Sequence, residues 1–173
     1  MILDSLLSFS LTAGDVPTVT AVSGNILDLH MAGIPVLANL SGARDIGIGD
    51  DPALKLLVQV TATFAGGTSL QVTLQGATDN GSGSPNAFSA WWSSPVYALA
   101  TLVQGARLYD MDMPRPPQGI AVPRFLRLSY ITVGTHTAGA LFAAILLDRP
   151  DQMYQSTSNA VIGGYPPGIA IAN

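Results

Sequence analysis

The sequence predicts an all-β fold: a single-domain, jelly-roll-like antiparallel β-sandwich with extended N- and C-terminal arms. Three observations support this prediction. Val, Thr, Ile, Gly and Pro are plentiful, whereas Glu and Lys, both good helix formers, are almost absent. Several short runs alternate between apolar and polar residues, which is the period of a half-buried strand. Turn residues separate these runs, and a chain of 173 residues suits one domain.

The first segment of the chain, residues 1–15, is predicted to be an N-terminal arm or a short first element of secondary structure. It is mildly apolar and carries Asp4 where a signal peptide would have a basic region, so we interpret it as mature sequence. The sandwich domain is predicted over residues 16–148. Its first strand falls within residues 18–29, where apolar and polar residues alternate.

The clearest pair of strands lies in the middle of the chain. Even positions from Leu56 to Phe64 are apolar, and residues 70–75 repeat this alternation. The segment AGGT at residues 65–68 has the composition of a tight turn, so the two runs predict a β-hairpin. Residues 79–85, DNGSGSP, then predict a flexible surface loop.

Further strands are predicted at residues 91–99, 107–113 and 124–133. They bring the total to roughly eight, which suits a sandwich or jelly roll. Long connections at residues 30–43 and 79–90 favour Greek-key crossings over a simple meander.

The last predicted strand, residues 138–148, is apolar on both faces. Leu141 and Ile145 can face the core, but Phe142 and Leu146 then need cover elsewhere. Two explanations stay open: a central strand covered by a loop or arm, or a subunit interface.

The C-terminal segment, residues 149–173, mixes Pro and Gly with apolar residues and predicts an arm that orders against a partner. Candidate protein-interface residues lie in the two arms and on the second face of the last strand: Leu6, Leu7, Phe9, Phe142, Leu146, Met153, Tyr154, Ile162 and Tyr165.

Charge is unusually scarce in this chain. Charged residues make up 10% of the sequence, where about 25% is usual. Hydrophobic residues make up 48%, mean hydropathy is +0.38 and the formal net charge is -4. We expect other protein to cover much of this surface. Seven scattered cations do not form a nucleic-acid site, and no apolar run is long enough to span a membrane, so neither partner is expected.

No catalytic, cofactor or metal site is predicted, and the chain is not expected to be an enzyme. It has no Cys, and the spacing of His30 and His136 does not indicate a metal site. A calcium site at Asp45, Asp50 and Asp51 is a weaker alternative than an ordinary Asp-rich turn.

The adjacent Trp91 and Trp92 leave a second function open, that of a carbohydrate- or receptor-binding jelly-roll module. We favour the simpler interpretation, in which one Trp lies in the core and its neighbour lies on the opposite face, at a rim.

Six segments in order resemble the jelly-roll capsid cement proteins of tailed bacteriophages, the group that includes the cement protein of a short-tailed Bordetella phage. They are MILD at 1–4, AVSGNILDL at 21–29, ARDIGIG at 43–49, LQVTLQ at 70–75, RFLRLSY at 124–130, and AG leading to LLD across 138–148. The order and spacing of the segments carry the resemblance, and the tail after Arg149 is longer than this group leads one to expect.

The resemblance implies a decoration protein on the exterior of the capsid of a virion, made in the host cytoplasm. It implies two partners: the phage major capsid protein, whose neighbouring subunits it would bridge, and the protein itself, as a homodimer, with a trimer as the alternative. Four charged residues in the matching segments, Arg44, Asp45, Asp28 and Arg127, are expected to form internal ion pairs, with Asp45 bound to Arg44 or Arg127.

Overall fold

The computed structural model describes residues 2–11, 14–31, 44–45, 53–121 and 123–148. Its elements, in chain order, are β1 (Ile2–Ser8), β2 (Ala21–Val22), β3 (Leu27–Asp28), β4 (His30–Met31), β5 (Arg44–Asp45), β6 (Ala53–Gly66), β7 (Ser69–Ala77), β8 (Ser89–Ser93), β9 (Tyr97–Ala98), the 3₁₀ turn η1 (Leu99–Thr101), β10 (Arg107–Asp112), β11 (Phe125–Val133) and β12 (His136–Asp148).

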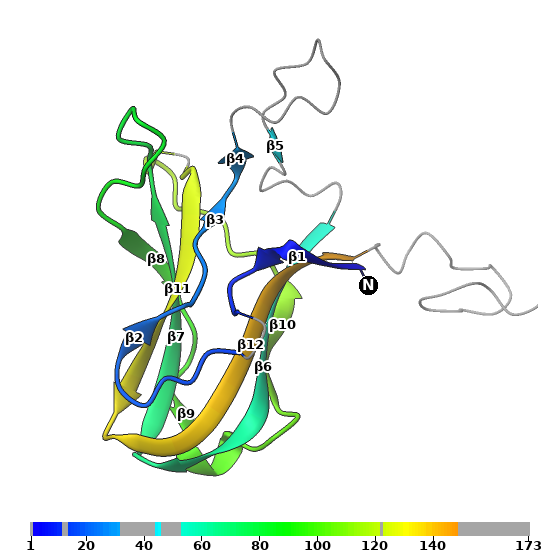
Figure 1. Cartoon of the computed structure of the whole chain (residues 1–173), viewed down its shortest axis with the longest axis vertical. Helices are drawn as coiled ribbons and strands as arrows, with labels where there is room; N and C mark the ends of the chain where they lie inside the picture. Colours follow the sequence, from blue (N-terminus) through cyan, green and yellow to red (C-terminus); the bar gives the residue numbers. More distant parts are fainter. Residues whose placement is uncertain (1, 12–13, 32–43, 46–52, 122, 149–173) are drawn as a thin grey trace, which may run out of the picture.

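Two antiparallel sheets face each other and confirm the predicted all-β sandwich (Figure 1). The first sheet has the order β1-β12-β6-β10. The second has the path β2-β11-β7-β8, with β3 beside β11 and β9 beside β7. A small separate ladder, β4 with β5, lies at one end of the sandwich (Figure 1). The inward-facing side chains of both sheets form one apolar core. The alternate side chains of each strand point away from this core and form the outer faces of the sandwich.

The predicted hairpin of β6 and β7 is wrong, because the two strands belong to different sheets. Their alternation is as predicted: Leu56 and Val58 on β6 and Leu70 and Leu74 on β7 are all fully buried. The chain crosses the core between Gly66 and Ser69 instead of folding back within one sheet. Both strands still point their apolar side chains at the same core, so alternation alone cannot distinguish a hairpin from this crossing.

A second crossing turn, between β11 and β12, packs against the first. A Cβ atom added to Gly134 would lie 3.0 Å from the Cα of Gly67, so the two turns touch. The buried ring of His136 fills the junction: its Nδ1 lies 3.0 Å from the carbonyl oxygen of Gly66, and its Nε2 lies 3.3 Å from that of Ser69. His136 therefore belongs to the frame of the sandwich.

One side of the sandwich is closed by a buried polar network centred on Asp15. Its Oδ2 accepts hydrogen bonds from the Tyr130 hydroxyl at 2.7 Å and the Ser10 hydroxyl at 3.1 Å, and its Oδ1 accepts one from the Gly24 N–H at 2.9 Å. The backbone of Asp15 also exchanges two hydrogen bonds with Leu141 on β12. This residue thus connects both sheets to the segment that leads into β2.

The last strand confirms the prediction of two apolar faces. Leu141 and Ile145 lie in the main core, while Leu146 lies in a second cluster with Phe142 packed against it. β12 is a central strand, between β1 and β6. At the start of the chain, residues 2–8 form the strand β1, which is one of the two predicted alternatives for that segment.

Candidate interaction site

Part of the outer face of the second sheet carries apolar side chains among neutral polar ones. Arg127 lies on the same face, two positions before Ser129 on β11, and marks the limit of this uncharged part. Cross-strand partners share a face, so Val22, Ser129 and Thr73 form one row, and Ile131 with Gln71 forms the next. Val133, opposite Ser69, completes this surface at the end of β11. Val22, Ile131 and Val133 are 47%, 40% and 55% exposed, respectively. We call this set of residues (22, 69, 71, 73, 129, 131 and 133) the uncharged face.

The segment that leads into β2 extends this apolar surface along the edge of the sandwich. Its exposed large hydrophobic side chains are Leu11, Val16 and Val19, and Ile26 is a fourth, between β2 and β3. Each is roughly half exposed, a state that is normal for single side chains but informative when several follow one edge. This edge and the uncharged face together suit contact with another protein.

The outer face of the first sheet carries a smaller apolar cluster. Leu57, Ala144 and Leu146 are buried, and Phe142 is partly buried against them. The charged residues Asp110 and Lys55 are the cross-strand partners of Leu57 and Leu146, so this face is mixed in character. Of the two predicted interface residues on this face, Phe142 is partly exposed, whereas Leu146 is buried.

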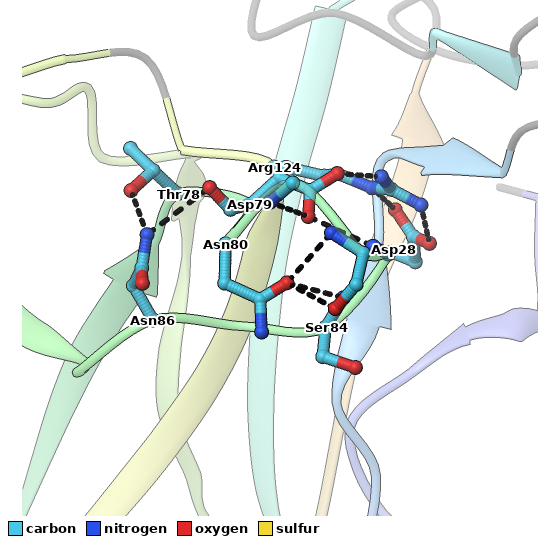
Figure 2. A network of polar contacts seen from close by, with 10 residues as sticks. Asp28, Thr78, Asp79, Asn80, Ser84, Asn86 and Arg124 are labelled. Carbon is cyan, nitrogen blue, oxygen red and sulfur yellow. Dashed lines mark hydrogen bonds and ion pairs between the residues drawn. The ribbon is translucent and has the colours of Figure 1, made fainter.

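At one end of the sandwich, Arg124 binds two carboxylates brought together from distant parts of the chain (Figure 2). Its Nε and Nη2 donate to the two oxygens of Asp28 at 2.8 and 2.9 Å, and its Nη1 binds Asp79. All three side chains are largely covered. We call Asp28, Asp79 and Arg124 the clasp.

The clasp favours the charged forms of Arg124 and Asp79. The hydrogen bond to Asp28 is the main cause that raises the pKa of Arg124 above its usual value. For Asp79, desolvation acts to raise the pKa, but the backbone N–H groups of Gly81 and Gly83 and the charge of Arg124 outweigh it, so the pKa is lowered. The ion pairs therefore persist across the neutral range.

The clasp holds the loop between β7 and β8, residues 78–88, through Asp79. Its Oδ1 accepts hydrogen bonds from the N–H groups of Gly81 and Gly83 at 2.9 and 3.0 Å. Asn80 accepts from the backbone and hydroxyl of Ser82, and Asn86 closes the loop by donating to the carbonyl of Asp79 at 3.1 Å (Figure 2). The loop has the sequence of a flexible linker, but its side chains give it a fixed conformation.

Both tryptophans pack against the core, contrary to the prediction that they point to opposite faces. The register of β8 against β7 shifts between Leu74 and Gln75, and this β-bulge places Trp91 over Gly76, on the same side as Trp92. Trp92 contacts the ring of Tyr109 at a centroid distance of 4.6 Å. Among the described side chains, the Nε1 of Trp91 is the buried polar atom without a hydrogen-bond partner.

The predicted interface residues do not form one surface in the described part of the chain. Phe9 and Leu146 are 0% and 1% exposed, and Leu7 packs partly buried against the core. The side chain of Leu6 and the tail residues lie outside the described residues: Met153, Tyr154, Ile162 and Tyr165. Their roles at an interface remain predictions, whereas the uncharged face was not anticipated.

The prediction of internal ion pairs holds for Asp28, but Arg127 makes other contacts in the structure. Asp28 pairs with Arg124, and Arg127 donates to Gln75 at 2.7 Å and stacks over the ring of Phe88 at 4.0 Å. The side chain of Asp45 lies outside the described residues, as do the side chains of Arg44 and His30 and all of Asp50 and Asp51.

No group of three or more His, Cys, Asp or Glu side chains among the described residues could hold a metal ion. No helix within the described ranges is long and apolar enough to cross a membrane.

A protein-family model matches most of the chain. The family model described as Bbp16, a name taken from a Bordetella phage protein, matches residues 11–145. This range runs from the segment before β2 into β12 and therefore covers most of the sandwich. No curated protein matches the chain.

Proposed function

The chain belongs to the Bbp16 family, and from this premise we propose that it is a capsid cement protein, which binds the outer surface of a phage icosahedral shell and bridges neighbouring major capsid subunits. Family membership itself indicates a phage structural protein, a component of the virion. The match over residues 11–145 is the observation that carries the proposal, and the surface of the sandwich supports the finer role.

The surface supports cementing because it combines exposed apolar side chains with few charges. A bridging protein must bind many equivalent sites through modest contacts, and repetition around the shell then multiplies their effect. Val22, Ile131 and Val133 supply exposed apolar area beside the partly exposed, neutral Gln71, while the Ser and Thr residues of the uncharged face are buried among them. Such a surface binds protein more readily than nucleic acid, which requires a basic patch.

Cryo-electron microscopy of particles with and without this protein tests the proposal. We expect difference density on the outside of the shell, lying across the seams between major capsid subunits. Density confined to the tail, the interior or the centre of single subunits would contradict a bridging role. A glycan array with the free protein tests the carbohydrate-binding alternative, for which the two half-buried tryptophans give no specific support.

A charge placed on the uncharged face tests which surface binds the shell. We expect Ile131→Lys to reduce co-sedimentation with shells that lack the protein, because the ammonium group would be desolvated at the contact. Val96→Lys is the matched control, since Val96 is also exposed but lies between β8 and β9, at the opposite edge of the second sheet. Equal binding of both variants would exclude the uncharged face as the contact.

Self-association belongs to the same proposal. We expect a homodimer in solution, because a chain with this little charge is not suited to remain a free monomer. Light scattering across a dilution series measures the mass directly, and a monomer at all concentrations would contradict this part of the proposal.

A further inference from the structure

Asn80 is the one asparagine in the sequence that is followed by glycine. An Asn–Gly pair is chemically labile, because glycine has no side chain to hinder attack of its backbone nitrogen on the neighbouring amide carbon. Both residues are exposed, and no atom lies within 4 Å of a Cβ built on Gly81. Steric cover therefore does not protect this pair.

The reaction needs no partner other than water. The backbone nitrogen of Gly81 loses its proton and forms a bond to the Cγ of Asn80, and the bond from Cγ to the side-chain nitrogen breaks. That nitrogen takes up a proton and leaves as ammonia, and the product is a five-membered succinimide. Water then opens the ring at either carbonyl and gives aspartate or isoaspartate.

Both reacting groups are held away from this pathway (Figure 2). The N–H of Gly81, the nucleophile, donates to Asp79 Oδ1 at 2.9 Å. The side-chain oxygen of Asn80 accepts from the N–H and hydroxyl of Ser82 at 2.9 and 2.7 Å and from the N–H of Ser84 at 3.4 Å. Ring closure must break these hydrogen bonds, because it requires Asn80 to turn its amide carbon toward the nitrogen of Gly81.

The clasp supplies the restraint on the nucleophile. Asp79 is fixed by Arg124, and Arg124 is fixed in turn by two hydrogen bonds to Asp28, which precedes Asp79 by about 50 residues in the chain. The lowered pKa of Asp79 also makes its carboxylate a weak base for removing the Gly81 proton.

We propose that Asn80–Gly81 is a deamidation site that the clasp keeps largely unreacted, so that the chemical lifetime of the loop depends on the ion pairs behind it. Reaction would replace a neutral amide by a carboxylate beside Asp79. The new charge would repel the carboxylate of Asp79. In the isoaspartate product, the lengthened backbone would also displace the oxygen to which Ser82 and Ser84 donate. Deamidation would therefore loosen the loop that had protected Asn80.

Peptide mapping by mass spectrometry tests this proposal on the full-length protein, incubated at mildly alkaline pH. We expect Asn80 to deamidate at least about tenfold faster in Asp79→Ala than in the unchanged protein. This substitution removes the charged acceptor of the Gly81 N–H, and loss of a hydrogen bond to a charged group corresponds to a rate ratio of about this size. Asp110→Ala is the control, because it removes the exposed ion pair with Arg107 and leaves the clasp intact.

Two comparisons decide the result. A synthetic peptide of residues 77–87 should deamidate faster than the folded protein, and equal rates would overturn the proposal. Equal rates in Asp79→Ala and in the unchanged protein would overturn it as well. If circular dichroism shows that Asp79→Ala does not fold, Arg124→Lys decides in its place, since it weakens the hold on Asp79 and should also raise the rate.

Discussion

Tyr130→Phe removes one hydroxyl from the centre of the sandwich and leaves the ring in place. That hydroxyl donates to Asp15 at 2.7 Å, and both residues are buried, at 0% and 9% exposure. A hydrogen bond to a charged group contributes about 1.5–3 kcal/mol net, so we expect the free energy of unfolding to fall by about that amount. For a domain of this size the corresponding fall in Tm is roughly 3–12 °C.

Urea unfolding followed by tryptophan fluorescence measures this loss, with Tyr109→Phe as the matched control. The hydroxyl of Tyr109 donates to the carbonyl of Asp112 at 3.2 Å in an exposed contact, so its removal should change stability by less than about 0.5 kcal/mol. Equal effects of the two substitutions would refute the reasoning, because they would show that the Asp15 network does not hold the two sheets together.

Three further predictions follow from single features of the sandwich. Gly139→Ala should lower the free energy of unfolding, measured by chemical denaturation, by at least about 2 kcal/mol, because φ is +131° and the new Cβ would lie 2.4 Å from the ring of Phe64. Gly105→Ala is the control: its φ is +86° but the space around it is open, so the substitution should cost about 1 kcal/mol. The clasp should contribute its full stability at pH values above the ordinary Asp pKa of 3.8 and lose it as the pH falls through the lowered pKa of Asp79. NMR of the Gly81 amide should show the loop opening in this acidic range, and a signal that stays unchanged through it would contradict this prediction. Burial, with the nearby Asp15 carboxylate as a further cause, raises the pKa of Tyr130 well above 10.0. The contribution of this hydroxyl to stability should therefore be complete below pH 10 and disappear at higher pH. An ultraviolet titration in which every tyrosine ionises near pH 10 would contradict this.

Period-two alternation predicted the long strands and which of their faces is buried. It succeeded for β6 and β7 because burial of apolar side chains decides which way each residue points. It failed for the connection between β6 and β7, since a strand in the opposite sheet buries the same alternating positions. It also failed at Trp91, because a bulge inserts one residue and reverses the parity on one side of it.

The clasp could not be predicted from the sequence, because its members are distant in the chain. Asp28 and Arg124 are separated by 96 positions, and nothing local marks them as partners. The loop after β7 did carry a signal in its Asp, Asn and Ser residues, but that signal is shared by flexible linkers. The uncharged face was equally hidden, since it arises from the register of three strands.

The two stacked crossing turns have a consequence for folding kinetics. One turn joins β6 to β7 and the other joins β11 to β12, but the strands that pair are β6 with β12 and β7 with β11. Neither turn therefore brings two paired strands together by itself. The contact between His136 and Gly66 spans 70 positions, so little of the core can form before distant parts of the chain meet. Sandwiches with such non-local pairing fold in milliseconds to seconds, and we expect a single cooperative step in which both turns form together.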